Sequence, residues 1–348
     1  MTERFVELPF LRNVGLMMTY KCQVTCPHCI VQAGPHRREE MLVNDACEWV
    51  GQIAAYRNGY IKVVALTGGE PFYNLDNLRI VSDCVQQSGL LTSVVTNAFW
   101  ASTPERALAV LQGLPAIRIL SISTDIYHQV AIPLTWVKNA AWAAEACGIA
   151  YSISVCTEHE EEKGYLEIID KLLEFTSREL ILTAIALPVG RALKKLNKAK
   201  YATTTEVPIS ACATGSSPVI FPDGRVIGCI GPVIDLESSH PLVLGNLRDN
   251  SLAEILEAAQ SNTILHAIRA WGPKKLIPMI RDAGLDHLLP HRYIKDSVCD
   301  ACYNLMANTQ IVEFLNGVAV DSEFQRTVAY ARAYYLQEPE MVESLGLA

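Results

Sequence analysis

One stretch near the start of the sequence, residues 19–29, reads Thr19-Tyr20-Lys21-Cys22-Gln23-Val24-Thr25-Cys26-Pro27-His28-Cys29. It follows an apolar run, and its cysteines have the spacing Cys-x3-Cys-x2-Cys. Three thiolates this close together can bind one face of an iron–sulfur cubane, which usually takes four cysteine ligands. One iron would then stay open to another ligand. The alternatives are a chance cluster or a zinc site, but zinc sites usually combine two Cys-x2-4-Cys pairs, and this loop supplies an odd number of cysteines.

This spacing after an apolar strand resembles the signature of the radical S-adenosylmethionine (SAM) enzymes. The resemblance implies that Cys22, Cys26 and Cys29 hold a [4Fe–4S] cluster whose open iron chelates the amino and carboxylate groups of SAM. In that family one electron cleaves SAM to a 5′-deoxyadenosyl radical, which abstracts hydrogen from a substrate. A flavodoxin- or ferredoxin-type partner is the electron donor that the resemblance implies.

Short apolar runs alternate with helical patterns from about residue 14 to residue 187. This alternation predicts right-handed βαβ crossovers and a parallel sheet. The predicted strands are Val14–Thr19, Ile61–Leu66, Thr92–Thr96, Ile117–Ser123, Ala150–Val155 and Leu180–Ala186. Six such units make a partial, TIM-like (β/α)6 barrel, which is also the core of the radical SAM family. We expect this α/β core at residues 1–200, a small cluster-binding domain at 201–310, and C-terminal helices at 311–348.

Chemistry in parallel barrels gathers where the strands end. Thr67-Gly68-Gly69-Glu70-Pro71 follows the second predicted strand, and glycines let a backbone approach a ligand closely. The turn resembles the family motif in which backbone carbonyls and the glutamate contact the amino group of SAM. His28 stands where the family usually has an aromatic residue near the adenine, although a lone histidine is as often structural.

Three further strand ends supply candidate SAM contacts. Thr96-Asn97 ends the third strand, where the family often has Thr-Asn-Gly, but Ala98 replaces the glycine. Ser123 and Asp125 resemble the pair that approaches the ribose hydroxyls, although Asp125 could instead cap the next helix. Arg191, in a Pro-x-Gly-Arg-Ala turn, could pair with a carboxylate or lie at the surface. The Arg-Gly pair that many relatives carry after the fourth strand is missing, which leaves the partner of the SAM carboxylate open.

A second cysteine set lies in the C-terminal half. Pro222-Asp223-Gly224 predicts a hairpin that brings Cys212 near Cys229, and a Cys-x2-Cys pair follows much later. This arrangement resembles the SPASM extension of radical SAM enzymes, or its shortened twitch form. The resemblance implies one auxiliary [4Fe–4S] cluster, because the longer form needs more cysteines for two; its ligands would be Cys212, Cys229, Cys299 and Cys302. The alternatives are a structural Zn(Cys)4 ribbon and a partly open site.

The sequence has 11 cysteines and no secretory signal, which indicates metal binding rather than disulfides and a cytoplasmic location. Outside the two sets, Cys47, Cys84 and Cys147 fall on helical patterns and are expected to be buried apolar residues. Cys156 ends the fifth strand and is a candidate catalytic thiol. Tyr73 and His128 also follow strand ends and are candidates to line the substrate cavity, although either could serve in packing.

Charge and length limit the substrate classes. A formal net charge of −8 disfavours a nucleic-acid partner, and no apolar run reaches the ~18 residues of a membrane span. Relatives with such an extension include peptide maturases and dehydrogenases of small alcohols. We expect an oxidoreductase-type radical enzyme that modifies a peptide by cross-link, thioether or epimerisation. The alternatives are a radical SAM dehydrogenase of a small metabolite and a non-enzymatic cluster scaffold. About thirteen residues precede the first predicted strand, so we expect any peptide-recognition domain to be a separate protein.

Overall fold

The computed structural model describes residues 10–197, 201–207, 210–236, 239–295 and 297–338, together with Met341 and Leu345. The chain divides into two compact units. The first comprises residues 14–202 and 220–223, and the second comprises the described parts of residues 1–13, 203–219 and 224–348. The domain boundaries that the sequence suggests near residues 200 and 310 remain predictions.

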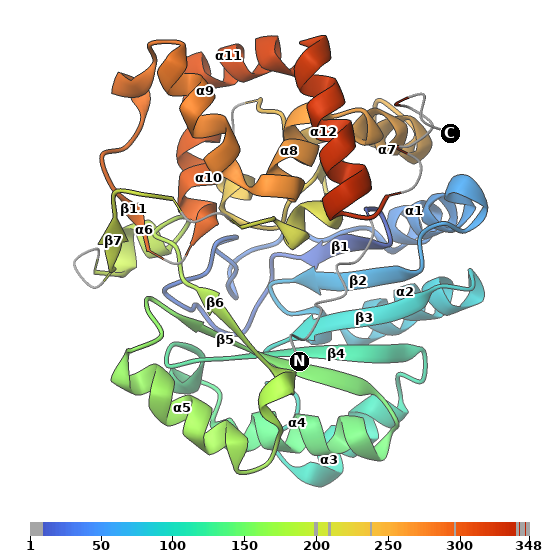
Figure 1. Cartoon of the computed structure of the whole chain (residues 1–348). Coiled ribbons are helices and arrows are strands. Elements are labelled where there is room, and N and C mark those ends of the chain that lie inside the picture. Colours follow the sequence, from blue (N-terminus) through green and yellow to red (C-terminus); the bar gives the residue numbers. More distant parts are fainter. Residues whose placement is uncertain are drawn as a thin grey trace. The chain divides into compact units, whose positions relative to one another are not determined.

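The first unit is an open parallel α/β barrel (Figure 1). Its strands lie side by side in chain order: β1 (Asn13–Thr19), β2 (Val63–Gly68), β3 (Leu91–Thr96), β4 (Ile117–Thr124), β5 (Ala150–Thr157) and β6 (Ile181–Ile185). From β2 to β6, each strand pairs in parallel with the next. In the described residues β6 does not pair back to β1, so the barrel stays open as predicted. All six predicted strands are confirmed, with ends within two residues.

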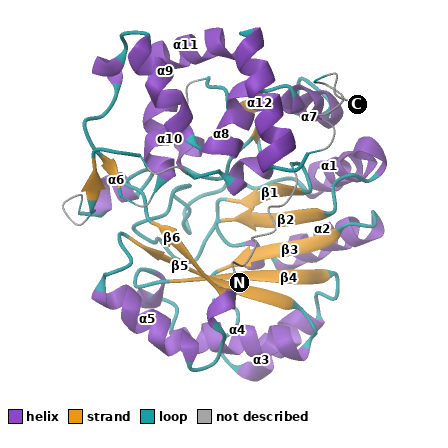
Figure 2. Cartoon of the chain, viewed as in Figure 1, coloured by secondary structure: helices purple, strands orange, loops and turns teal. Residues whose placement is uncertain are grey.

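Helices connect these strands in the βαβ manner (Figure 2). They are α1 (Val43–Ala55), α2 (Leu75–Gln87), α3 (Pro104–Gln112), α4 (Leu134–Ala146) and α5 (Lys163–Leu173), with a short α6 (Ala192–Lys195) after β6. The start of α3 is fixed locally, because the Thr103 side chain accepts a hydrogen bond from the backbone of Arg106 and Pro104 occupies the first turn. The central strands β4 and β5 bury alternate side chains, as a sheet with a packed face requires.

The prediction for the helical cysteines is wrong. Cys47 on α1 and Cys84 on α2 form a disulfide with a Cα–Cα distance of 5.7 Å, and Cys147 is only half-buried. Helices α1 and α2 pack against each other, which brings two cysteines 37 positions apart in sequence within bonding distance. The number of cysteines and the predicted location of the protein do not reveal which cysteines pair.

The second unit is mainly helical. Its strands are β7 (Thr203–Thr204), β8 (Val219–Ile220), β9 (Arg225–Ile227), β10 (Val243–Asn246) and β11 (Tyr293–Ile294). Its helices are α7 (Leu252–Gln260), α8 (Thr263–Trp271), α9 (Leu276–Asp282), α10 (Val298–Ala307), α11 (Thr309–Ala319) and α12 (Ser322–Tyr335). The hairpin predicted at Pro222-Asp223-Gly224 is present between β8 and β9. No described helix is long and apolar enough to cross a membrane.

The sequence from Leu252 to Leu265 reads as one continuous helix, but the structure has two, α7 and α8. The Asn262 side chain accepts a hydrogen bond from the backbone of Leu265 and so caps the start of α8. An asparagine side chain that accepts a hydrogen bond from a nearby backbone amide competes with the helical hydrogen bonds, and the helix therefore breaks at Asn262. The predicted helical tail begins in α11 and α12 and then runs partly outside the described residues.

A buried ion network joins α8 and α12 to the chain after α12. The Arg269 guanidinium donates to Glu338 Oε1 at 2.7 Å, and Arg332 Nε donates to Glu338 Oε2 at 2.6 Å. Arg269 also contacts His266 Nδ1, so that His266 is assigned as neutral, with its Nε2 proton donated to the Ala259 carbonyl. Burial, and then the two arginine charges, lower the pKa of His266 well below its usual value, which agrees with a neutral ring.

Replacing Glu338 by glutamine is expected to destabilise the protein by about 3–5 kcal/mol, because two buried guanidinium groups lose their shared counter-charge. Burial alone would raise the pKa of Glu338, but the two arginines outweigh it and lower that pKa below 4.5. The stabilisation is therefore present above pH 4.5 and is lost as the pH falls through the folded-state pKa. Urea unfolding of Glu338→Gln and wild type should show a gap that narrows on acidification. Glu313→Gln, on the exposed face of α11, is the control and should change stability by no more than about 0.5 kcal/mol.

Candidate iron–sulfur and SAM site

The three-cysteine loop follows β1 and folds back on itself. Cys22 and Cys26 are buried and Cys29 is half-buried. The Cys29 amide donates to the Cys26 carbonyl at 3.2 Å, and the Ala33 amide donates to Cys29 Sγ at 3.3 Å. Together with Gly68, Gly69 and Asn97, the three cysteines line one cavity of about 140 Å³. The structure therefore brings together the three predicted ligands and the predicted SAM turn.

The donor set fits an iron–sulfur cluster. Burial raises the pKa of the Cys22 thiol to about 12 and raises that of Cys29 as well. Buried thiols at this spacing are stabilised as thiolates only when a cation binds, and binding then releases their protons. Asn97 Nδ2 lies 3.5 Å from Cys22 Sγ and can donate a hydrogen bond to it. Hydrogen bonds of this kind to ligand sulfurs tune the potential of a cluster.

The Gly-Gly-Glu-Pro turn lies against the backbone that leads into the cysteine loop. Gly69 N donates to the Thr19 carbonyl at 2.6 Å, and Glu70 N donates to the Lys21 carbonyl at 2.9 Å. A Cβ at Gly68 would meet the Thr19 carbonyl oxygen, and a Cβ at Gly69 would meet the Lys21 carbonyl oxygen, both too closely to be accommodated. The two glycines are therefore required by the close approach of two backbone segments beside the cavity.

Replacing Gly69 by alanine is expected to lower the rate of reductive SAM cleavage by about 100-fold, because the added Cβ must push the turn away from the cysteine loop. Gly51→Ala on α1 is the matched control, since nothing lies within 4 Å of its new Cβ. That change should leave cleavage unaltered and raise stability by roughly 0.5–1 kcal/mol. Formation of 5′-deoxyadenosine under dithionite measures both effects, and wild-type cleavage by Gly69→Ala would contradict this role of the turn.

Glu70 joins the SAM turn to the end of β3. Its carboxylate is fully buried and accepts hydrogen bonds from the Phe72 amide, the Thr96 hydroxyl and the Asn97 amide at 2.8–3.1 Å. Burial raises its pKa to about 7, although these hydrogen bonds act in the opposite direction. Ala98, which replaces the family glycine, adopts the left-handed conformation with φ 65° that glycine favours. The substitution therefore leaves the local backbone in the glycine-type conformation.

Asp125 is the centre of a buried polar cluster after β4. Its Oδ1 accepts from the amides of Tyr127 and His128 at 2.9 Å, and its Oδ2 lies 2.8 Å from His128 Nδ1 and 3.5 Å from His28 Nε2. Burial alone would lower the pKa of His128, but Asp125 outweighs it and raises that pKa well above its usual value. Burial lowers the pKa of His28 to about 4, so His28 is neutral at pH 7. Asp125 thus holds both histidines in place, and its predicted contact with the ribose stays a prediction.

The predicted site residues take different places around this cavity. His28, Ser123 and His128 line it, and the His28 ring lies 4.8 Å from the Tyr127 ring. Tyr73 is 44% exposed and does not line it. Cys156 is half-buried at the end of β5; burial, and then the charges of Asp125 and Glu158, raise the pKa of its thiol. Cys156 therefore stays protonated at neutral pH.

Arg191 binds the cysteine loop. Its guanidinium donates to the Cys26 carbonyl at 2.8 Å and to the Ala33 carbonyl, and its own amide donates to the Cys29 carbonyl at 3.2 Å. Gly190, with φ 58°, leaves no room for a Cβ beside the Ile30 carbonyl. The Pro-x-Gly-Arg-Ala turn thus supports the loop from the end of β6, a role that its sequence did not disclose.

Sequence reasoning missed three polar groups that interact with residues of the predicted site. Gln23 Nε2 donates to Asn97 Oδ1 at 2.9 Å, and Trp100 Nε1 donates to the Thr96 hydroxyl at 3.0 Å. Burial, and then Glu158 and Cys156, raise the pKa of the Tyr201 phenol. Only Gln23 carried a signal, because it lies inside the three-cysteine loop.

The second cysteine set meets in one apolar pocket of the second unit. Cys212 precedes a 3-10 turn at Ala213–Ser216, Cys229 follows β9, and Cys299 and Cys302 lie three residues apart on α10. Residues at that spacing share a helix face. The rest of the lining is apolar or glycine: Gly215, Pro232, Val233, Leu242, Leu265, Ile268, Pro273 and Val298.

Four converging thiols in an apolar enclosure fit a closed metal centre. Burial, and then the neighbouring Cys212, raise the pKa of Cys299 to about 11, and those of the other three also rise. The charges of neighbouring cysteines contribute to the raised pKa of Cys229, Cys299 and Cys302, so ionised sulfurs in this pocket would repel one another. A bound cation would relieve that repulsion.

Comparison with known proteins assigns both regions. The model of the radical SAM superfamily matches residues 16–153, and the model of the SPASM iron–sulfur cluster-binding domain matches residues 212–303. The Bacillus subtilis (strain 168) protein YydG, whose provisional name assigns it to peptide biosynthesis, is 20% identical over 308 residues, covering 87% of this chain and 94% of YydG.

Three solved structures are similar to parts of this chain. Methylornithine synthase (PylB) matches with a TM-score of 0.43 and 14% identity over 55% of this chain, which spans 58% of that chain's length. BtrN in complex with AdoMet and 2-DOIA matches with a TM-score of 0.38 and 13% identity, over 72% of this chain and 85% of BtrN. HydG, a maturase of the [FeFe]-hydrogenase, matches with a TM-score of 0.40 and 13% identity, over 94% of this chain and 82% of HydG.

The two family matches enclose the two cysteine sets, since Cys22, Cys26 and Cys29 fall in the first and all four remaining candidate ligands fall in the second. Residues 16–153 therefore form a radical SAM domain, and residues 212–303 form a SPASM iron–sulfur cluster-binding domain.

Proposed function

We propose that this radical SAM enzyme modifies a peptide, by forming a cross-link or thioether or by epimerising a residue. The observation that carries the proposal is the pair of cysteine sets: three thiols beside a glycine-rich turn, and four thiols enclosed by apolar side chains. The full-length similarity to YydG, a protein named for peptide biosynthesis, supports the peptide class.

In this proposal Cys22, Cys26 and Cys29 hold a [4Fe–4S] cluster, and Cys212, Cys229, Cys299 and Cys302 hold one auxiliary cluster. When bound, the first cluster and SAM together supply a 5′-deoxyadenosyl radical for hydrogen abstraction. Gly68, Gly69, Asn97 and Ser123 provide the walls for SAM, because all four line the cavity of the three cysteines. The proposed electron donor is a flavodoxin- or ferredoxin-type protein, and the proposed location is the cytoplasm.

The chain's own residues prepare this site. Arg191 binds two loop carbonyls and holds the cysteine loop, while Asp125 fixes His28 and His128. Cys156 keeps its proton at neutral pH and is the proposed thiol that contacts substrate. A protonated thiol is a poor nucleophile, so the proposed role of Cys156 is to donate hydrogen rather than to form a thiolate adduct.

Co-expression with each short peptide gene beside its own gene tests the peptide class. The expected result is a peptide changed in mass or in residue chirality, seen by mass spectrometry and chiral amino-acid analysis. Peptides that stay unchanged, while the purified enzyme oxidises a small alcohol in a SAM-dependent reaction, would establish the metabolite dehydrogenase instead.

A further inference from the structure

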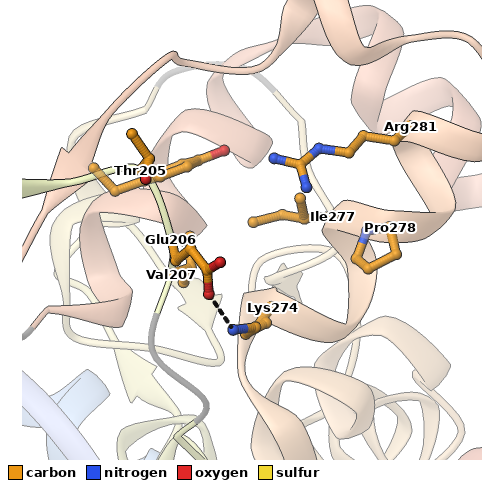
Figure 3. A pocket seen from close by; sticks show the side chains of 8 residues that line it. Thr205, Glu206, Val207, Lys274, Ile277, Pro278 and Arg281 are labelled. Atoms are coloured by element: carbon orange, nitrogen blue, oxygen red, sulfur yellow. Dashed lines mark ion pairs between the residues drawn. The ribbon is translucent and has the colours of Figure 1, made fainter.

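The second unit contains a polar cavity that neither cysteine set uses. It has a volume of about 170 Å³, well above the ~10–15 Å³ that a single water needs. One wall is the chain after β7, at Thr205, Glu206 and Val207, together with Tyr293 of β11, which pairs with β7. The opposite wall consists of Lys274, Ile277, Pro278 and Arg281, from the turn before α9 and from α9 itself (Figure 3).

Arg281 brings an uncompensated charge to this cavity. Its guanidinium points from α9 toward the opposite wall (Figure 3) and makes no hydrogen bond or ion pair with the part of the chain that the structure describes. Lys274, in contrast, lies 3.6 Å from the exposed carboxylate of Glu206. That pair cancels, so one net positive charge remains among the lining residues. A guanidinium keeps its charge at any accessible pH and matches the two oxygens of a carboxylate.

Tyr293 is the second, independent observation. Its side chain is only 2% exposed, yet its hydroxyl has no hydrogen-bond partner among the described residues. Tyr293 lines the same cavity as Arg281; burial raises the pKa of this phenol, and the Arg281 charge opposes that shift. A buried hydroxyl without a partner is unfavourable unless a ligand accepts its hydrogen bond.

The remaining lining favours a carboxylate on an aliphatic stem over inorganic phosphate. Val207 and Ile277 are both about 96% buried and give the cavity apolar walls beside its charged end. A carboxylate with a short hydrocarbon stem would use both features, because its stem contacts the apolar walls while its head reaches Arg281 and Tyr293. A phosphate ion would leave the apolar walls unused and would usually call for more than one unpaired cation or amide donor.

We propose that this cavity binds a carboxylate of the peptide substrate, from an acidic side chain or from the C-terminus. The proposal rests on the peptide-modifying function proposed above and assigns it a substrate-anchoring subsite in the second unit. Among the described residues, Glu206 forms an ion pair with Lys274 and none with Arg281.

Titrations of the reconstituted enzyme with small probes, monitored by saturation-transfer NMR, test this subsite. The probes are N-acetylglutamate α-amide for a side-chain carboxylate, N-acetylleucine for a terminal one, N-acetylglutamine α-amide as the neutral isostere, and inorganic phosphate. At least one carboxylate should bind about tenfold or more tightly than the neutral isostere. The tighter of the two carboxylates identifies its source.

Variants of the lining residues test whether Arg281 and Tyr293 bind the carboxylate. Arg281→Gln should weaken the better carboxylate at least about tenfold, and Tyr293→Phe several-fold, whereas Arg326→Gln on the exposed face of α12 should change nothing. Thermal unfolding and iron content confirm that each variant is folded. Equal binding of the acid and its amide, full affinity in Arg281→Gln, or tighter binding of phosphate than of either carboxylate would overturn the proposal.

SAM cleavage and peptide modification by the wild-type enzyme are measured in parallel, so the two proposals can fail separately. If SAM cleavage is intact but no carboxylate binds, the proposed subsite is refuted and the proposed function stands. If carboxylates bind through Arg281 but the enzyme modifies no peptide, the proposed function is refuted and only a carboxylate-binding site remains.

Discussion

Replacing Cys22, Cys26 and Cys29 together by alanine is expected to reduce 5′-deoxyadenosine formation to the background seen without enzyme. The three thiols line the same cavity as the Gly68-Gly69 turn, so their removal deletes all three proposed cysteine ligands at the proposed SAM site. Iron should fall from about eight to about four per chain, since each [4Fe–4S] cluster holds four. Anaerobic reconstitution, iron analysis and chromatography of the SAM products measure both changes.

The iron that remains in this variant is its own control for folding, because it reports the second cysteine set. Cys147→Ala is a further control: this half-buried cysteine at the C-terminal end of α4 belongs to neither set and should not affect iron content or cleavage. Wild-type yields of 5′-deoxyadenosine from the triple variant would show that the loop is not the site of SAM cleavage.

Replacing Cys299 and Cys302 by alanine is expected to separate SAM cleavage from product formation. Both residues lie on one face of α10 in the apolar pocket of the second unit, and neither lines the cavity of the three-cysteine loop. The variant should lose about four irons per chain while still producing 5′-deoxyadenosine. It should make no modified peptide, because a closed cluster with no open iron is suited to accept an electron from the substrate radical.

Metal analysis of the wild-type protein decides between two contents of that pocket. About eight irons and no zinc per chain agree with an auxiliary cluster, whereas about four irons and one tightly bound zinc would select a structural Zn(Cys)4 site. Full product yield from a folded Cys299→Ala/Cys302→Ala variant would leave the second set a structural role and refute electron transfer.

The strands and the two groups of cysteines could be predicted because both are local signals. Each strand of the first unit is a short apolar run bounded by turn residues, and each cysteine set has a readable spacing. These features depend little on how distant segments pack. The Gly-Gly-Glu-Pro motif was readable as a turn at a strand end, but the contacts with Thr19 and Lys21 that leave no room for a side chain at residues 68 and 69 appear only in the structure.

The features that escaped prediction depend on tertiary packing. Cys47 and Cys84 form a disulfide only because α1 lies on α2, and Arg191 reaches the cysteine loop only because β6 ends beside it. The region from residue 272 to 298 had no periodic pattern, yet it supplies Arg281 and Tyr293 to the polar cavity. The charge of that cavity becomes visible only once ion pairing among its residues is known.

The most direct test of the central claim is deuterium transfer from a fully deuterated peptide, encoded by a short gene beside that of the enzyme, to 5′-deoxyadenosine. The peptide is incubated with the reconstituted enzyme, SAM and dithionite, and the nucleoside is analysed by mass spectrometry. The account predicts 5′-deoxyadenosine one mass unit heavier, formed together with a modified peptide. Unlabelled 5′-deoxyadenosine beside an unchanged peptide, with deuterium delivered instead by a labelled small alcohol, would contradict it.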